Sequence, residues 1–157
     1  MSVPGITFVE SADDLSAHQL RGGFWAGWPN PPSPETHLRI LRGSAAVVLA
    51  QDDATGAIVG FVTAITDGVL SAYIPSLEVL PAWQGRSVGG ALLRRLLERL
   101  RHLYMIDLIC DPQLQPYYAL HGMQPATGMV IRNYDRQSGA AADVGDHAGA
   151  EGAGLHL

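Results

Sequence analysis

A glycine-rich turn between two strongly patterned segments limits how this chain can fold. The segment from Ala72 to Leu80 is a short apolar run, and residues 81–90, PAWQGRSVGG, follow it directly. Leucines then recur at helical spacing, at positions 92, 93, 96, 97, 100 and 103, with arginines and Glu98 between them. That spacing places one apolar stripe on a helix, and the stripe needs a sheet to pack against. The sequence therefore predicts a strand, a glycine turn and an amphipathic helix in succession.

The turn also has the chemistry of an anion site. Glycines let the backbone approach a ligand closely, the first N–H groups of a helix have no partners within the helix, and the helix dipole favours negative charge there. Arg86 adds a full positive charge. Two known phosphate motifs do not fit, because the Walker loop requires a lysine, which this chain lacks, and the G-x-G-x-x-G fingerprint is absent. Taken alone, the turn is equally consistent with a simple tight reversal.

Strand and helix patterns both occur along the rest of the chain. The proline-rich, aromatic stretch from Gly22 to Pro34 predicts an irregular loop, and Asp52 to Gly56 has the composition of a turn between antiparallel strands. Predicted strands cover residues 6–9, 45–50, 57–65, 72–80, 104–110 and 129–134, and predicted helices cover residues 12–21, 34–42, the leucine-striped segment and 115–121. The fold class is therefore mixed α and β.

Two motifs in this order resemble a known family. The segment Gln84-Gly85-Arg86-Ser87-Val88-Gly89 matches the pattern Gln/Arg-x-x-Gly-x-Gly/Ala, and residues 118–123, YALHGM, are similar to a later Tyr-x-x-x-Gly-Phe motif. Over about residues 5–135 the chain resembles the GNAT superfamily of N-acetyltransferases. The resemblance implies the GNAT fold, an α/β fold of order β-α-α-β-β-β-α-β-α-β whose central, mostly antiparallel sheet is flanked by helices.

The resemblance implies acetyl-CoA as co-substrate. The backbone amides from Arg86 to Gly90 would hold its pyrophosphate, and the backbone at Val79 would pair with the pantetheine arm, although the end of that segment could equally be an ordinary strand end. The implied binding residues are Val79, Leu80, Pro81, Gln84, Gly85, Arg86, Ser87, Val88, Gly89 and Gly90. Ser87 departs from the family's middle glycine, and a positive φ there would cost about 1 kcal/mol. Its hydroxyl could instead donate to a phosphate oxygen.

Acetylation of an amine needs a group that removes a proton from the nitrogen and one that protonates the departing thiolate. Glu78, beside the expected strand bulge, is the candidate base, and it could equally be a surface or salt-bridged glutamate. Tyr118, the tyrosine of the later motif, is carried over as the candidate acid. Tyr117 is interpreted as a packing residue unless the short helix shifts register, and Tyr73 is a weaker candidate for the base or the acceptor site.

The resemblance brings the aromatic loop toward the amine acceptor. Phe24, Trp25 and Trp28, with Tyr73, are the weak acceptor-site candidates, and the rings could equally cover the core. The expected acceptor is a primary amine of a small molecule or peptide. Two other functions stay open: a non-catalytic acetyl-CoA-binding or sensor module, and a protein N-terminal acetyltransferase. A homodimer is expected only from the resemblance.

Composition narrows the remaining function classes. The net charge of −5 argues against a nucleic-acid binder. The single cysteine, Cys110, agrees with a reducing compartment, and no His, Cys and carboxylate spacing suggests a metal site. No long apolar run or signal-like N-terminus is present, so we expect a cytoplasmic protein without membrane association. Residues 136–157, rich in Gly and Ala, are expected to form a disordered tail after a domain of residues 1–135.

Overall fold

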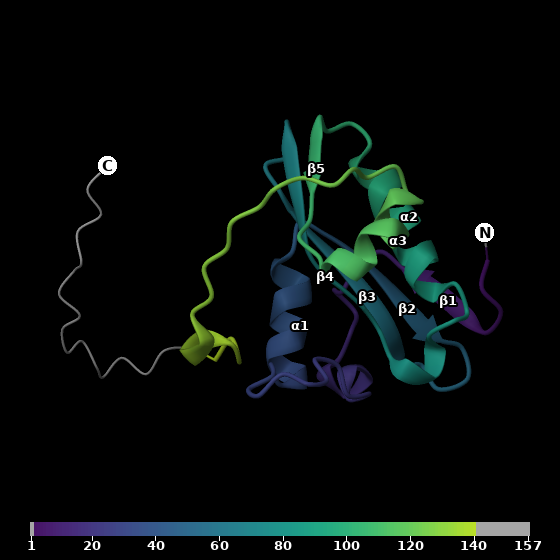
Figure 1. The fold of residues 1–157 in the computed structure, drawn as a ribbon. Helices are drawn as coiled ribbons and strands as arrows, with labels where there is room; N and C mark the ends of the chain where they lie inside the picture. Colours follow the sequence, from purple (N-terminus) through teal and green to yellow (C-terminus); the bar gives the residue numbers. More distant parts are fainter. Residues whose placement is uncertain (1, 141–157) are drawn as a thin grey trace, which may run out of the picture.

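The computed structural model describes residues 2–140, which form one five-stranded sheet with helices on both faces (Figure 1). The strands lie in sequence order, each pair antiparallel except the last, which is parallel. They are β1 (Ile6–Val9), β2 (Ala46–Asp52), β3 (Ile58–Thr66), β4 (Ser71–Val79) and β5 (Met105–Asp107). The three α-helices are α1 (Pro34–Gly43), α2 (Val88–Leu100) and α3 (Gln115–Ala119). The mixed fold class expected from the sequence is confirmed.

The two longer helices begin differently. At α1 the Ser33 hydroxyl accepts the N–H of Thr36, and Pro34 occupies the first turn, where its missing N–H costs nothing. The helix predicted after Ser33 therefore forms. At α2 the residue before the helix, Ser87, makes no capping hydrogen bond through its side chain. The start of α2 therefore has no cap from the side chain of Ser87.

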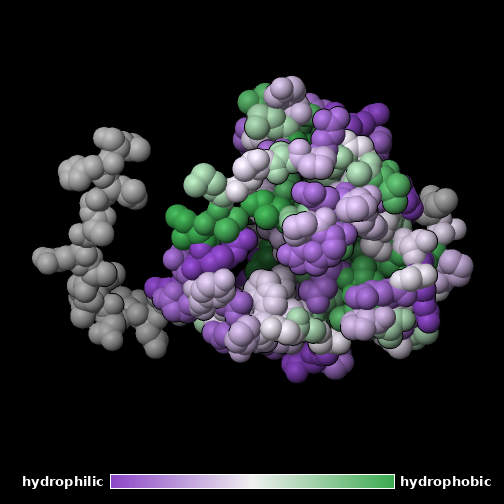
Figure 2. Space-filling view, in the orientation of Figure 1, coloured by the Kyte–Doolittle hydropathy of each residue, from purple (hydrophilic) through white to green (hydrophobic). Residues whose placement is uncertain are grey.

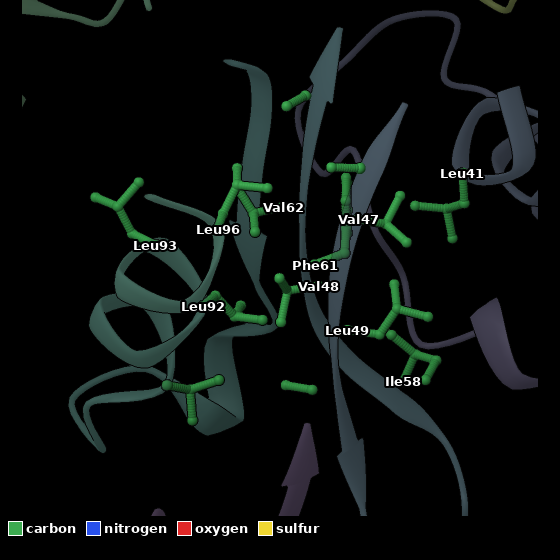
Figure 3. Packing of buried hydrophobic residues seen from close by; sticks show 14 of the residues in the cluster. Leu41, Val47, Val48, Leu49, Ile58, Phe61, Val62, Leu92, Leu93 and Leu96 are labelled. Atoms are coloured by element: carbon green, nitrogen blue, oxygen red, sulfur yellow. The ribbon is translucent and has the colours of Figure 1, made fainter. Parts of the chain in front are cut away.

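The core consists of two apolar layers separated by the sheet (Figure 3). On one face the leucine stripe of α2 packs against alternate residues of the central strands, and on the other face Leu41 of α1 packs against the residues between them (Figure 3). The first layer includes Leu92, Leu93, Leu96, Val48 and Val62, and the second includes Leu41, Val47, Leu49, Ile58 and Phe61. The predicted stripe is confirmed, since Leu92, Leu93 and Leu96 are fully buried.

The last two strands separate before they end. The parallel pairing of β4 with β5 covers only Ser71 to Tyr73 opposite Met105 to Asp107, whereas β4 continues to Val79. From residue 74 onward, the edge of β4 that faces away from β3 has no strand beside it in the described part of the chain. A fork therefore opens between β4 and β5, on the side of the sheet edge that leads to the glycine turn.

Two predicted elements are wrong. The helix expected over residues 12–21 is only a 3₁₀ turn, Ala17–Leu20. The guanidinium of Arg42 explains this, because it donates to the carbonyls of Ala12, Asp13 and Leu15, which a helix would use internally. The strand expected over residues 129–134 is not formed either; this stretch has no ladder partner, and a 3₁₀ turn begins at Tyr134.

The final strand does not form because β5, the strand it would pair with, is too short. The strand expected over residues 104–110 is reduced to β5, which offers three residues of edge. Residues 129–131 are apolar yet 95%, 53% and 85% exposed, and the chain continues across the molecule to the loop at Asn30, whose N–H donates to Gln137. The helix expected at 115–121 forms as α3. Most of the expected tail, from residue 141 onward, lies outside the described residues.

Candidate active site

The glycine turn, residues 84–90, joins the end of β4 to α2 and is held by its own side chains. Gln84 donates its side-chain amide to the carbonyl of Val79 at 2.9 Å, which ties the turn to the strand. The guanidinium of Arg86 lies 5.0 Å from the ring centre of Trp83. Gly85 and Ser87 both have left-handed backbones, with φ of 74° and 64°. The turn is therefore a fixed, exposed reversal, and serine does occupy the positive-φ position.

Main-chain donors collect where the turn becomes α2. The first hydrogen bond of the helix runs from the N–H of Ala91 to the carbonyl of Ser87 at 3.1 Å, so the helix uses none of the N–H groups of residues 88–90. The first turn has no acidic residue, and Ser87 is exposed. The helix dipole adds positive potential at the same point. This arrangement fits a bound diphosphate, because the main-chain donors and the positive end of the dipole lie at the same end of α2 and the positively charged Arg86 is in the adjoining turn.

The expected binding residues lie in two neighbouring segments, 79–81 and 84–90, between the end of β4 and the start of α2. They are Val79, Leu80, Pro81, Gln84, Gly85, Arg86, Ser87, Val88, Gly89 and Gly90. Their environments differ, because the side chains of Leu80 and Val88 are buried in the core, whereas residues 84–87 are exposed. Two members thus contribute packing through their side chains, and only their main chain is available to a ligand.

Tyr117 lies against the start of α2. A Cβ added at Gly89 would be 3.2 Å from the Tyr117 hydroxyl, so that hydroxyl is packed directly over the glycine. Burial raises the pKa of Tyr117, and the charge of Arg94 partly opposes this. The sequence interpretation treated Tyr117 as a packing residue. Only its position beside Tyr118 indicated any role, so its contact with the turn could not be predicted.

Tyr118 faces a different space, a groove of about 880 Å³ between β5 and the chain that follows α3. This β5 groove is lined by Tyr73, Tyr118, Cys110 and the stretch from Gly122 to Val130, among others. Figure 2 shows the molecule hollowed on this side, beside α3. Burial, with smaller contributions from Tyr117 and Cys110, raises the pKa of Tyr118 to about 12. Its phenol therefore stays protonated throughout the neutral range.

Glu78 is half-buried near the end of β4, opposite Phe61 of β3. Its two carboxylate oxygens accept the same backbone N–H, that of Trp25, at 3.0 and 3.1 Å. Burial raises the pKa of Glu78, and the bond from Trp25 partly offsets this rise. The structure thus groups Tyr73 with Tyr118 in the β5 groove, whereas Glu78 contacts the aromatic loop, residues 22–28.

The aromatic loop divides the expected acceptor residues. Phe24 and Trp25 are each 8% exposed and belong to the core, whereas Trp28 is 44% exposed and lies 5.0 Å from Trp25, ring centre to ring centre. Beneath them is His37 of α1, 4.4 Å from the ring of Phe61. Burial lowers the pKa of His37 to about 4, so it is neutral at pH 7. The spacing of His37 with Ile40 and Leu41 on a helix is the local signal that could have predicted this burial.

Residues 2–140 contain neither a cluster of metal-ligand side chains nor a membrane-spanning helix. Within that range no group of three or more His, Cys, Asp or Glu side chains could hold a metal ion. The same range contains no helix long and apolar enough to span a bilayer.

Comparison with known proteins adds a family and several relatives. The family described as acetyltransferase (GNAT) family matches residues 13–123. A solved structure from Deinococcus radiodurans R1, assigned as an acetyltransferase, is 44% identical, with a TM-score of 0.84, and the match covers 90% of this chain and 98% of that chain. A GNAT family protein from Streptococcus pneumoniae TIGR4 is 25% identical, with a TM-score of 0.62, over 82% of this chain and 98% of that one.

Curated relatives match a shorter stretch. Serotonin N-acetyltransferase 2 of Oryza sativa is 33% identical over 97 residues, which is 59% of this chain and 48% of the relative. The uncharacterised N-acetyltransferase ycf52 of Pyropia yezoensis is 27% identical over 95 residues, 59% of this chain and 55% of the relative. The chain thus spans about half the length of these relatives.

Proposed function

Because this chain belongs to the GNAT family of acetyltransferases, we propose that it moves the acetyl group of acetyl-CoA directly to a primary amine of a small molecule or peptide. The observation that carries the proposal is the start of α2, where the helix leaves three N–H groups unused beside an exposed turn that contains Arg86. The amine acceptor is supported by the relatives, one of which is named as a serotonin N-acetyltransferase.

In this proposal the main chain from Arg86 to Gly90 binds the diphosphate of acetyl-CoA. The Ser87 hydroxyl makes no capping bond and is exposed, so it can donate to a phosphate oxygen. The edge of β4 beyond Tyr73, left unpaired by the fork, offers main-chain groups to an extended arm in the manner of an added strand. The thioester would then lie between β4 and β5, close to the β5 groove.

The chemistry at the thioester requires a neutral amine whose nitrogen bonds to the carbonyl carbon while the carbon–sulfur bond breaks. We assign Tyr118 as the donor of a proton to the departing sulfur, because its phenol is protonated at neutral pH and lines the β5 groove. Glu78 is assigned as the acceptor of the amine proton, directly or through water. Its raised pKa makes it a better base than an exposed glutamate.

A thermal-shift titration with coenzyme A tests the binding half of the proposal. Stabilisation should grow with ligand concentration, as binding to the native state alone requires. A screen of small amines and peptides, with detection of released thiol, tests the transfer half. Binding without thiol release from any amine would identify a non-catalytic binding module, and release only with peptides would identify an N-terminal acetyltransferase. Absence of any shift at millimolar coenzyme A would refute the proposal.

A further inference from the structure

The aromatic loop contains a backbone conformation that its sequence does not favour. Trp25 has φ of 67°, in the left-handed region, between Gly23 and Gly27, which also have positive φ. Glycine adopts this region freely, whereas a bulky aromatic residue does so at a cost in free energy. Such strain persists only where surrounding contacts hold it, and it is concentrated at functional sites. The contacts of Trp25 therefore identify what holds the loop.

Two kinds of contact hold Trp25. Its ring is packed among Trp28, His37 and Phe61, with ring centres 5.0 to 5.4 Å away. Its backbone N–H points at the carboxylate of Glu78 and is shared by both oxygens, at 3.0 and 3.1 Å. The ring contacts fix the side chain, but they do not specify the direction of the peptide. The carboxylate does specify it, because it accepts the N–H of the left-handed residue.

The strength of this bond depends on the charge of Glu78. An ionised carboxylate is an acceptor only, and a hydrogen bond to it is stronger than one to a neutral carboxyl group. The described residues show no charged side chain shifting the pKa of Glu78, which responds to burial and to the Trp25 bond. The titratable group that faces the loop from α1 is His37. At the start of that helix Glu35 forms an exposed ion pair with Arg21, and the two side chains are 3.4 Å apart. Raising the solvent pH above the pKa of Glu78 therefore strengthens the hold on the loop.

We propose that Glu78 is a charge-dependent clamp on the aromatic loop: its ionised carboxylate holds the Trp25 peptide left-handed and so positions Trp28, and protonation of Glu78 releases both. Trp28 follows because its own N–H donates to the carbonyl of Trp25 at 3.1 Å and its ring rests on that of Trp25. Release turns the strained peptide toward the ordinary region and moves the exposed indole.

The clamp would couple proton transfer in the proposed reaction to access of the amine to the acceptor site. This consequence rests on the proposed function, in which Glu78 takes the proton of the amine. The uptake of that proton would loosen the loop beside the acceptor, so that the Trp28 side chain moves away from the acceptor after transfer. Return of the proton to solvent would restore the bond from Trp25 to Glu78, and with it the position of Trp28, before the next amine binds.

Tryptophan fluorescence of the full chain, titrated from pH 8 down to the ordinary pKa of a glutamate, about 4.5, without any substrate, tests the clamp. We expect the emission of the wild-type protein to move to longer wavelength on acidification, with a midpoint above the ordinary pKa of a glutamate. Glu78→Gln, which cannot titrate, should show no transition. Trp28→Phe should lose most of the amplitude, whereas Trp83→Phe should keep it.

His37→Phe is the matched control, because His37 also touches Trp25 but titrates at about pH 4, below the range of the experiment. Its transition should match that of the wild-type protein. A transition that persists in Glu78→Gln, that disappears in His37→Phe, or that is absent from the wild-type protein would overturn the clamp. If circular dichroism shows that Glu78→Gln is unfolded, Glu78→Asp decides, since an unchanged midpoint in that variant would also overturn it. The titration needs neither acetyl-CoA nor amine, so failure of acetyl transfer leaves its outcome unaffected.

Discussion

The glycine turn and the aromatic loop each contain one non-glycine residue with a left-handed backbone, and they support it in opposite ways. Ser87 has φ of 64° in an exposed reversal, and its side chain makes no capping bond. Trp25 has φ of 67°, is 8% exposed, and has its N–H bound by a carboxylate 53 residues away. In the part of the chain that the structure describes, these are the two non-glycine residues with positive φ.

This difference shows which contacts determine the conformation of the glycine turn and which determine that of the aromatic loop. The turn is shaped by local sequence, since glycines, Gln84 and the helix start lie within a few residues of each other. The loop is shaped by tertiary contacts from β3, β4 and α1. We therefore expect substitutions in the turn to affect ligand binding with little loss of stability, and substitutions around the loop to affect stability and its pH dependence.

The largest expected effect is on ligand binding, from Gly89→Glu. A new carboxylate at the start of α2 would repel a diphosphate and would press on the Tyr117 hydroxyl, which is 3.2 Å from the added Cβ. A like charge about 4 Å away near a protein surface costs about 4 kcal/mol, or about a 1,000-fold loss of coenzyme A affinity, measurable by calorimetry. Gly43→Glu adds the same charge in open space at the end of α1 and should leave the affinity unchanged. Equal losses in both variants would contradict the assignment of the turn.

The next effect concerns the loop and its dependence on pH. His37 is neutral in the native state down to about pH 4, but in the unfolded chain it takes up a proton near pH 6.5. The unfolded state binds more protons between these values, so the stability from the buried neutral imidazole is complete above about pH 6.5 and declines as the pH falls toward 4. The decline should reach about 3 kcal/mol. Urea unfolding at pH 7 and pH 4 should show a smaller decline in His37→Phe by about this amount, and equal declines would be evidence against the burial of His37.

Tyr118→Phe is expected to reduce kcat by about 100-fold, the usual size of a general-acid contribution, with little change in coenzyme A affinity. Tyr117→Phe is the matched control, because its hydroxyl touches Gly89 rather than lining the β5 groove. It should instead change coenzyme A affinity. Steady-state kinetics at saturating amine separate the two variants, and the reverse pattern would exchange the roles of the two tyrosines.

The smallest expected effect is on stability and comes from the left-handed backbone of Ser87. Replacing it by glycine removes the strain of a left-handed serine, so thermal unfolding should show a gain of about 1 kcal/mol. Gly85→Ser creates the same strain, since Gly85 has φ of 74° and open space around its Cβ position, and it should lose about as much. If Ser87→Gly also weakens coenzyme A binding, the hydroxyl contributes to phosphate recognition. No change in stability in either variant would contradict the strain argument.

Prediction from sequence succeeded where the signals were local. The leucine stripe, the helix that starts at Pro34 and the turn at Asp52 to Gly56 are all encoded within a few residues, and each forms as expected. The helix at 12–21 failed because a distant side chain, Arg42, uses its carbonyls. The strand at 129–134 failed because a strand requires a partner edge, and β5 is too short to supply one.

The candidate site followed the same rule. The ten expected binding residues lie in two neighbouring segments, 79–81 and 84–90, and a motif locates them in sequence. The contacts of Glu78 with Trp25 and of Tyr117 with Gly89 join residues from different elements, and no spacing in the chain encodes them. The roles of Glu78 and Tyr118 stay predictions until the variants are measured.

The short ladder between β4 and β5 has a consequence for how remote substitutions act. Only three residue pairs set the angle at which the two strands diverge, and they lie at the closed end of the fork. A small rotation of β5 relative to β4 at that end produces a larger displacement between the two strands at the open end. The side chains of Ser71 and Met105, which do not line the β5 groove, would thereby tune the distance between β4 and the phenol of Tyr118.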